Sequence, residues 1–145
     1  MYPFQRLNVW EKSHDLTLRV YRLTDAPASR RFPGLSSQLR RAVSAIPANI
    51  AEGAGHASQA QFARYLTIAI ASCHEAQYHF LLAKDLGAIP ETEYAHLEAR
   101  MKEVQAKLVL LRKRVVQKGR ESEKKRGGRT ASPLSSFSLH PAVTR

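Results

Sequence analysis

Two Glu-x-x-His pairs and two further acids give the sequence the ligand count of a carboxylate-bridged di-iron centre: Glu11–His14, Glu93–His96, Glu52 and Glu75. Such a centre needs both pairs to project into one layer of a helical bundle. Here the pairs fall at the starts of the first and the fourth predicted helices, which lie at opposite ends of an up-and-down bundle. The first helix, residues 9–24, is about 24 Å long. The pairs therefore cannot share an ion, and the sequence predicts no metal site and no cofactor.

The other reactive side chains fit no enzyme class. Arg6 and His14 have seven residues between them, too many for the Arg–His motif of bundle-type ribonucleases. The chain has neither a glycine-rich phosphate loop nor a hydrolase triad pattern. Cys73 is the single cysteine, so an internal disulfide is excluded, and its place among apolar positions predicts an inert core thiol. We therefore predict no enzymatic activity.

The charge balance favours a polyanionic partner. The 145 residues carry 23 Lys and Arg against 12 Asp and Glu, a formal net charge of +11. This excess favours RNA or DNA over a membrane surface. Basic residues recur at seven-residue steps in the fourth helix, on the face expected to point away from the apolar seam, and continue into a basic cluster: Arg100, Lys107, Arg114, Lys118, Lys124, Lys125 and Arg126. Few aromatic residues lie among them, so we expect contacts to phosphates rather than stacking on bases.

Arg40 and Arg41 form a second candidate site for nucleic acid. Because they are adjacent, they point about 100° apart on a helix. Each could contact a phosphate, or each could be a structural partner of Glu52, Glu75 or a backbone carbonyl. Arg40 and Glu52 are twelve residues apart, about 18 Å along one helix, so a pair between them would need a second subunit or a kink.

The periodic apolar residues, with capping residues, glycines and prolines between them, predict four helices, at about residues 9–24, 37–51, 59–86 and 92–118. Asn8 with Glu11, Ser36, and Ser58 with Gln61 are the expected N-caps, and Gly87 the expected C-cap. A loop is expected from Pro27 to Pro33. The fourth helix carries a heptad-like apolar seam, which indicates packing within a bundle.

The second predicted helix contains a proline, so we expect an irregular segment within it. Pro47 leaves the carbonyl of Val43 without its amide partner, so we expect a kink or a break. Asn49 could satisfy backbone groups there, and an acid at a helix end such as Glu52 needs a specific partner. We treat a set of five residues as a motif for assembly and the kink: Gln38, Pro47, Asn49, Glu52 and Gly53.

The predicted fold class is all-α, an antiparallel up-down four-helix bundle over residues 1–117 followed by a disordered basic C-terminal tail over residues 118–145. The tail carries a net charge of +5 with little apolar surface. It could be a nucleic-acid-binding arm or a solvated end. No apolar run approaches the roughly 20 residues of a membrane span, and no signal peptide is evident, so a cytoplasmic protein is expected.

One segment carries a family resemblance: GLSSQLRRAVSAIPANIAEG, residues 34–53. It resembles the signature of a bacterial four-helix-bundle family encoded in intervening sequences of large-subunit ribosomal RNA genes. Related bundles are accessory proteins to the reverse transcriptase of diversity-generating retroelements. The resemblance extends over most of residues 4–116. It implies a homo-oligomer, often a pentamer, with a basic surface and no established catalytic activity. The chain departs from the family pattern at a few positions: Arg30, His56, Gln61 and Ala71–Ser72.

Two functions are consistent with these observations. The first is a non-enzymatic, homo-oligomeric accessory protein that binds nucleic acid, RNA in particular, by contacting the sugar-phosphate backbone of the nucleic acid. The second is an oligomeric protein–protein scaffold that docks a partner such as a polymerase without touching nucleic acid itself.

Overall fold

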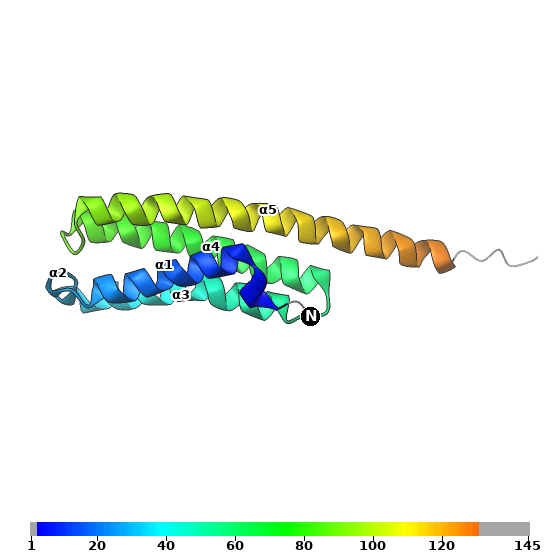
Figure 1. The fold of residues 1–145 in the computed structure, drawn as a ribbon, viewed down its shortest axis with the longest axis horizontal. Coiled ribbons are helices and arrows are strands. Elements are labelled where there is room, and N and C mark those ends of the chain that lie inside the picture. The colour runs from blue at the N-terminus through cyan, green and yellow to red at the C-terminus, as the bar shows by residue number, and fades with distance from the viewer. Residues whose placement is uncertain (1–2, 131–145) are drawn as a thin grey trace, which may run out of the picture.

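The computed structural model describes residues 3–130 and is helical throughout (Figure 1). Its elements are η1 (Phe4–Arg6), α1 (Asn8–Thr24), α2 (Pro27–Arg30), α3 (Pro33–Ala54), α4 (Gln59–Asp85) and α5 (Glu91–Thr130). The four long helices run antiparallel. α1 packs on α3 and α5, and α4 packs on the same two helices. The predicted all-α, up-and-down bundle is therefore confirmed.

The core is formed by the apolar stripes that the sequence pattern identified. The seam of α5 is buried at Leu97, Met101, Val104, Leu108 and Val115. It meets the buried side chains of the other three helices, which include Leu16, Val43, Ile46, Leu66 and Phe80. Among residues 3–130, no helix is both long enough and apolar enough to cross a membrane.

Helix starts differ from the predictions where packing competes with capping. α1 begins at Asn8 itself, with Leu7 at the N-cap and no side-chain cap, so the predicted Asn8 cap is wrong. The amide of Leu7 donates to the carbonyl of Phe4, and Leu7 packs against the core. This hydrophobic anchor fixes the entry of the chain in place of a polar cap. The predicted cap at Ser58 is confirmed, since its hydroxyl accepts from the amide of Gln61 at 3.3 Å.

α3 begins at Pro33 rather than at residue 37. Proline suits the first position of a helix because its φ is already helical and its missing N–H would have no partner there. Ser36 is therefore not a cap, and its hydroxyl donates to the carbonyl of Ser29 at 3.2 Å. The expected loop before α3 instead contains the one-turn helix α2. At the far end of α4, Gly87 has φ +73°, as its predicted role as C-cap requires.

α5 is longer than expected. The sequence predicted a helix end near Lys118 and a disordered tail after it, but α5 continues to Thr130, so this prediction is wrong for residues 118–130. Low apolar content argues against burial, not against lengthening a helix that is already nucleated, because each added residue gains a hydrogen bond. Gln117 also donates to Glu121 one turn later, at 3.0 Å. The rest of the predicted tail, residues 131–145, lies outside the described residues.

Pro47 does not break α3, which runs without interruption from Pro33 to Ala54. The carbonyl of Val43, which loses its amide partner to Pro47, lies 3.1 Å from the hydroxyl of Thr17 on α1. The same buried hydroxyl lies 2.8 Å from the carbonyl of Ser13. The single hydroxyl proton of Thr17 is shared between these two carbonyls, so a neighbouring helix in part replaces the donor that proline removes.

α3 and α4 approach most closely at Gly53. A Cβ atom at this position would lie 2.8 Å from Cδ2 of Phe62 and 2.8 Å from Cβ of Tyr65. Only glycine fits there, so Gly53 sets how closely the two helices pack near their connecting loop.

Gly53→Ala should destabilise the fold by about 1–3 kcal/mol, because α4 must move away to admit the new methyl group. The control is Gly34→Ala in the same helix, where no atom lies within 4 Å of the added Cβ. That substitution should be neutral or should stabilise by up to about 1 kcal/mol. Urea unfolding followed by circular dichroism measures both, and equal effects of the two changes would contradict the close approach.

Thr17→Val should cost about 1–3 kcal/mol, because it leaves the buried carbonyl of Val43 without a donor. In a Pro47→Ala background the same change should cost less, since the alanine restores the amide that bonds to Val43. A double-mutant cycle of unfolding free energies measures this coupling. Additive effects of the two substitutions would show that Thr17 does not substitute for the missing amide.

Candidate nucleic-acid interface

A line of cations follows one flank of α5, and we call it the cationic stripe: Arg100, Lys107, Arg114, Lys118, Lys125 and Arg129. Steps of seven and four residues keep these positions within about 60° of one another around the helix axis. The stripe extends over 30 residues of continuous helix, about 44 Å from first to last. Five of its members are sequence-predicted. Arg129 ends the basic cluster that begins at Lys124, and its four-residue step from Lys125 continues the pattern.

The stripe does not lie opposite the apolar seam, as the sequence analysis had expected. Arg100, Lys107 and Arg114 each come directly before a buried seam residue, so they point about 100° from it. The stripe therefore flanks the seam on the side of α1. Lys107 and Arg114 line a shallow hollow together with the start of α1. The seven-residue period that aligns these cations also keeps each of them at the same angle from the seam around the helix axis.

One acid beside the stripe, Glu103, is paired with a cation of another helix. Glu103 forms an ion pair with Lys12 of α1 at 2.8 Å. The hydrogen bond and the charge of Lys12 lower the pKa of Glu103, and Lys107 and Arg100 lower it further. The local field is therefore positive, and this acid holds α5 to α1 without cancelling the charge of the stripe.

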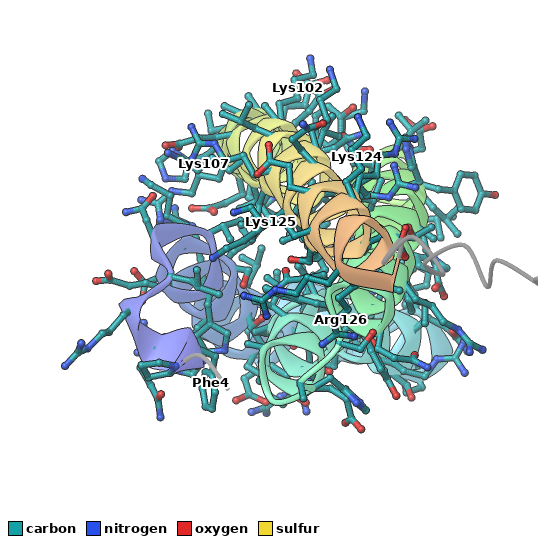
Figure 2. All side chains as sticks on the ribbon, turned by 90° about the vertical axis from the view of Figure 1, so that its right-hand side faces the viewer. Phe4, Lys102, Lys107, Lys124, Lys125 and Arg126 are labelled. Carbon is teal, nitrogen blue, oxygen red and sulfur yellow. The ribbon has the colours of Figure 1, made fainter. Side chains whose placement is uncertain are left out.

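Beyond the bundle, α5 projects as a single helix (Figure 1). Gly119 still faces Gln59 at the start of α4, and the side chains of residues 120–129 are all exposed. Viewed from this end, Lys124, Lys125 and Arg126 point in three different directions around the axis (Figure 2). They do not form the single patch that their adjacency suggests: Lys125 continues the stripe, while Lys124 lies on the other flank.

Arg40 and Arg41 are held in different ways. Arg40 donates from Nε to the hydroxyl of Thr24 at 2.8 Å and from Nη2 to Asp25 at 2.9 Å. Its guanidinium also lies 4.8 Å from the ring centre of Tyr21. Arg40 thus ties the end of α1 to α3, with partners that the sequence analysis did not anticipate. Arg41 reaches Glu75 on α4 at 3.5 Å, one of the partners considered for this pair.

The five residues of the proposed assembly motif do not share a surface. Pro47 and Gly53 are buried within the chain, and Asn49 donates to the carbonyl of Ala45 at 2.7 Å. Gln38 and Glu52 are exposed on α3, but fourteen residues separate them, about 21 Å along the helix. Only these two remain available for contacts with another molecule.

The candidate metal ligands have other partners or lie apart. Glu93 accepts hydrogen bonds from both Nε and Nη2 of Arg19, at 3.2 and 3.0 Å, and this pair joins α5 to α1. His14 stacks on Trp10 with ring centres 5.0 Å apart. Within residues 3–130, no group of three or more His, Cys, Asp or Glu side chains is placed to hold a metal ion. Burial raises the pKa of the Cys73 thiol to about 12, so it stays protonated at neutral pH.

Comparison with known proteins completes this description. A comparison with curated proteins gave no match. The family model described as 23S rRNA-intervening sequence protein matches residues 5–109, most of the bundle including the α3 motif. The match ends within α5, so Arg114 and the projecting part of the stripe lie beyond it. The chain belongs to the 23S rRNA-intervening sequence protein family.

Proposed function

We propose that this protein is a non-enzymatic, homo-oligomeric accessory protein that binds nucleic acid, RNA in particular, along the cationic stripe of α5. The observation that carries the proposal is the geometry of the stripe: six cations on one flank of one continuous helix, over about 44 Å. A nucleic-acid backbone presents a regularly spaced row of phosphates that can run along the whole stripe.

Binding would act on the backbone and would depend on salt. Lys and Arg side chains bond phosphate oxygens and release condensed counterions, and this mode reads no sequence. The stripe has no aromatic side chain among its members, so base stacking contributes little. The expected ligand is therefore any accessible run of backbone, on RNA or on a ribonucleoprotein.

Assembly would multiply this effect. α4 exposes three large apolar side chains, Ile68, Tyr78 and Leu81, and Leu86 directly after its end is exposed as well. Their burial between subunits supports the homo-oligomer that family membership suggests, with a pentamer as the expected ring. Several stripes held in one ring would bind a single polyanion with higher avidity than one stripe alone.

The same α4 surface is also what favours the alternative, a scaffold that docks a protein such as a polymerase. Tyr78 is 60% exposed, and large exposed aromatic side chains are typical anchors of protein interfaces. Loss of partner binding on substitution of Arg40 or Arg41, with RNA binding intact, would favour the scaffold function.

Neutralising the projecting end of the stripe should weaken binding and its salt dependence together. The triple change Lys118→Gln, Lys125→Gln and Arg129→Gln should lower the slope of log K against log salt concentration by about 2–3, because each lost phosphate contact removes about 0.7–0.9. Filter binding of an RNA oligonucleotide between low and moderate salt measures the slope.

The matched control removes three exposed charges from the other flank of the same helix, through Lys102→Gln, Lys113→Gln and Lys124→Gln. Both variants lose the same net charge, so only the placement differs. The control should keep a slope close to that of the unmodified protein. Equal losses in both variants, or binding that salt barely changes, would contradict the stripe as the interface.

The α4 surface predicts the outcome of a second experiment. Ile68→Glu with Tyr78→Glu should reduce the mass measured by light scattering toward the 16.3 kDa of one chain, because charges are costly to bury between subunits. Leu110→Glu, at an apolar residue of α5 that is 50% exposed, is the control and should leave the mass unchanged. A single-chain mass for the unmodified protein would contradict assembly.

A further inference from the structure

α1, α2 and α3 meet at the end of the bundle opposite to the projecting helix (Figure 1). Their side chains there line an open hollow of about 530 Å³. Its lining includes three arginines, Arg30, Arg40 and Arg41, together with Tyr21, Ser36 and Ser37, and it contains no carboxylate. We call it the arginine hollow. We infer that the arginine hollow binds a nucleotide through a terminal phosphate monoester, with the base against Tyr21.

The arginines leave positive charge available to a ligand. Arg40 is fixed by Thr24 and Asp25 through its Nε and Nη2, so both N–H groups of Nη1 remain for an acceptor. Arg41 is 73% exposed and only 3.5 Å from Glu75, a long and weak ion pair. Arg30 has no ion pair with any residue from 3 to 130 and is exposed. Asp25 and Glu75 offset two of the three charges at most, and that of Arg30 stays uncompensated.

The other lining groups suit the remainder of a nucleotide. The Tyr21 ring is 42% exposed. The Arg40 guanidinium covers one of its faces, 4.8 Å from the ring centre, and a base can stack on the other face. Ser37 offers a hydroxyl that can donate to phosphate or sugar oxygens. α3 begins at Pro33, in the wall of the hollow, so the positive end of its dipole adds to the attraction for an anion.

Charge and size favour a terminal phosphate over the phosphodiester of an unbroken backbone. A phosphate monoester carries about −1.5 to −2 at neutral pH and has three acceptor oxygens, which suits a hollow lined by arginines. A diester carries a single charge, for which the cationic stripe suffices. The volume also falls within the range of about 300–1,000 Å³ that small-molecule sites occupy.

The ligand could be a free mononucleotide or the phosphorylated end of a nucleic-acid strand. In the second case the inference rests on the proposed function, because the hollow would then hold the end of a strand whose backbone lies on the stripe. The shared chemistry is the phosphate monoester next to a base.

The test compares the full chain binding to AMP and to two short RNA oligonucleotides of one sequence, with a 5′-phosphate or a 5′-hydroxyl, by calorimetry and fluorescence anisotropy. The phosphorylated strand should bind about tenfold more tightly or better, as expected for charged hydrogen bonds. Arg30→Gln with Arg41→Gln should remove this difference. The matched control, Arg22→Gln with Arg64→Gln, removes two exposed arginines outside the hollow and should preserve it.

A second variant, Tyr21→Leu, separates base recognition from attraction of any anion. It should weaken AMP at least several-fold more than it weakens inorganic phosphate, with an unchanged circular dichroism spectrum as the check on folding. Tight AMP binding would identify a free nucleotide as the ligand, and a preference seen only with the phosphorylated strand would identify a strand end.

Equal affinity for both strands together with no AMP binding would overturn the inference. The salt slope and its loss in the stripe variant would still report on the proposed function separately. Conversely, AMP binding that depends on Arg30 would support the hollow even if the stripe bound no RNA.

Discussion

The alignment of α1 against α3 is the constraint on which the rest of the structure depends. Pro47 takes one amide out of the middle of α3, and the fold stays intact because Thr17 of α1 lies opposite the orphaned carbonyl of Val43. Near the end of α1, Arg40 of α3 bonds Thr24 and Asp25. These contacts together fix how far α1 is shifted along α3. That shift in turn forms the arginine hollow at one end and brings the start of α1 beside the cationic stripe.

A second constraint is electrostatic, since a chain with a net charge of +11 must tolerate its own repulsion. Along most of the stripe, successive cations are seven residues apart, about 10.5 Å. This is close to the Debye length of about 10 Å at 0.1 M salt, so the mutual repulsion of neighbours is largely screened. A polyanion that lies along the stripe comes close to every cation at once. The spacing therefore limits the cost of folding while it keeps the attraction for an extended ligand.

Much of the fold could be predicted because helical periodicity reports burial directly. The seam of α5, the Ser58 cap and the Gly87 turn all depend on short-range rules, and they are confirmed. The starts of α1 and α3 could not be predicted as well, because the burial of Leu7 and the fixed φ of Pro33 override the capping preference of nearby Asn8 and Ser36. The end of α5 was misjudged because composition predicts burial and says little about the length of an exposed helix.

The candidate sites likewise divide into one that local sequence predicts and one that depends on how the helices pack. The stripe is readable from the sequence because its members share one helix and one period. The arginine hollow is not, because it brings Tyr21, Arg30 and Arg40 together from three different helices. Arg30 in particular lies on α2, a one-turn helix where the sequence analysis expected a loop. Arg40 was considered both as a structural residue and as a phosphate contact, and its partners Thr24 and Asp25 depend on the same local geometry.

The projecting end of α5 differs from the rest of the molecule in how freely its length can change. Its side chains after Gly119 are exposed, so insertion or deletion of whole heptads there would leave every packed layer of the bundle as it is. The family match ends at residue 109, well before this segment. The projecting end of α5 can therefore lengthen or shorten during evolution to suit a new ligand, while the stability of the core stays the same.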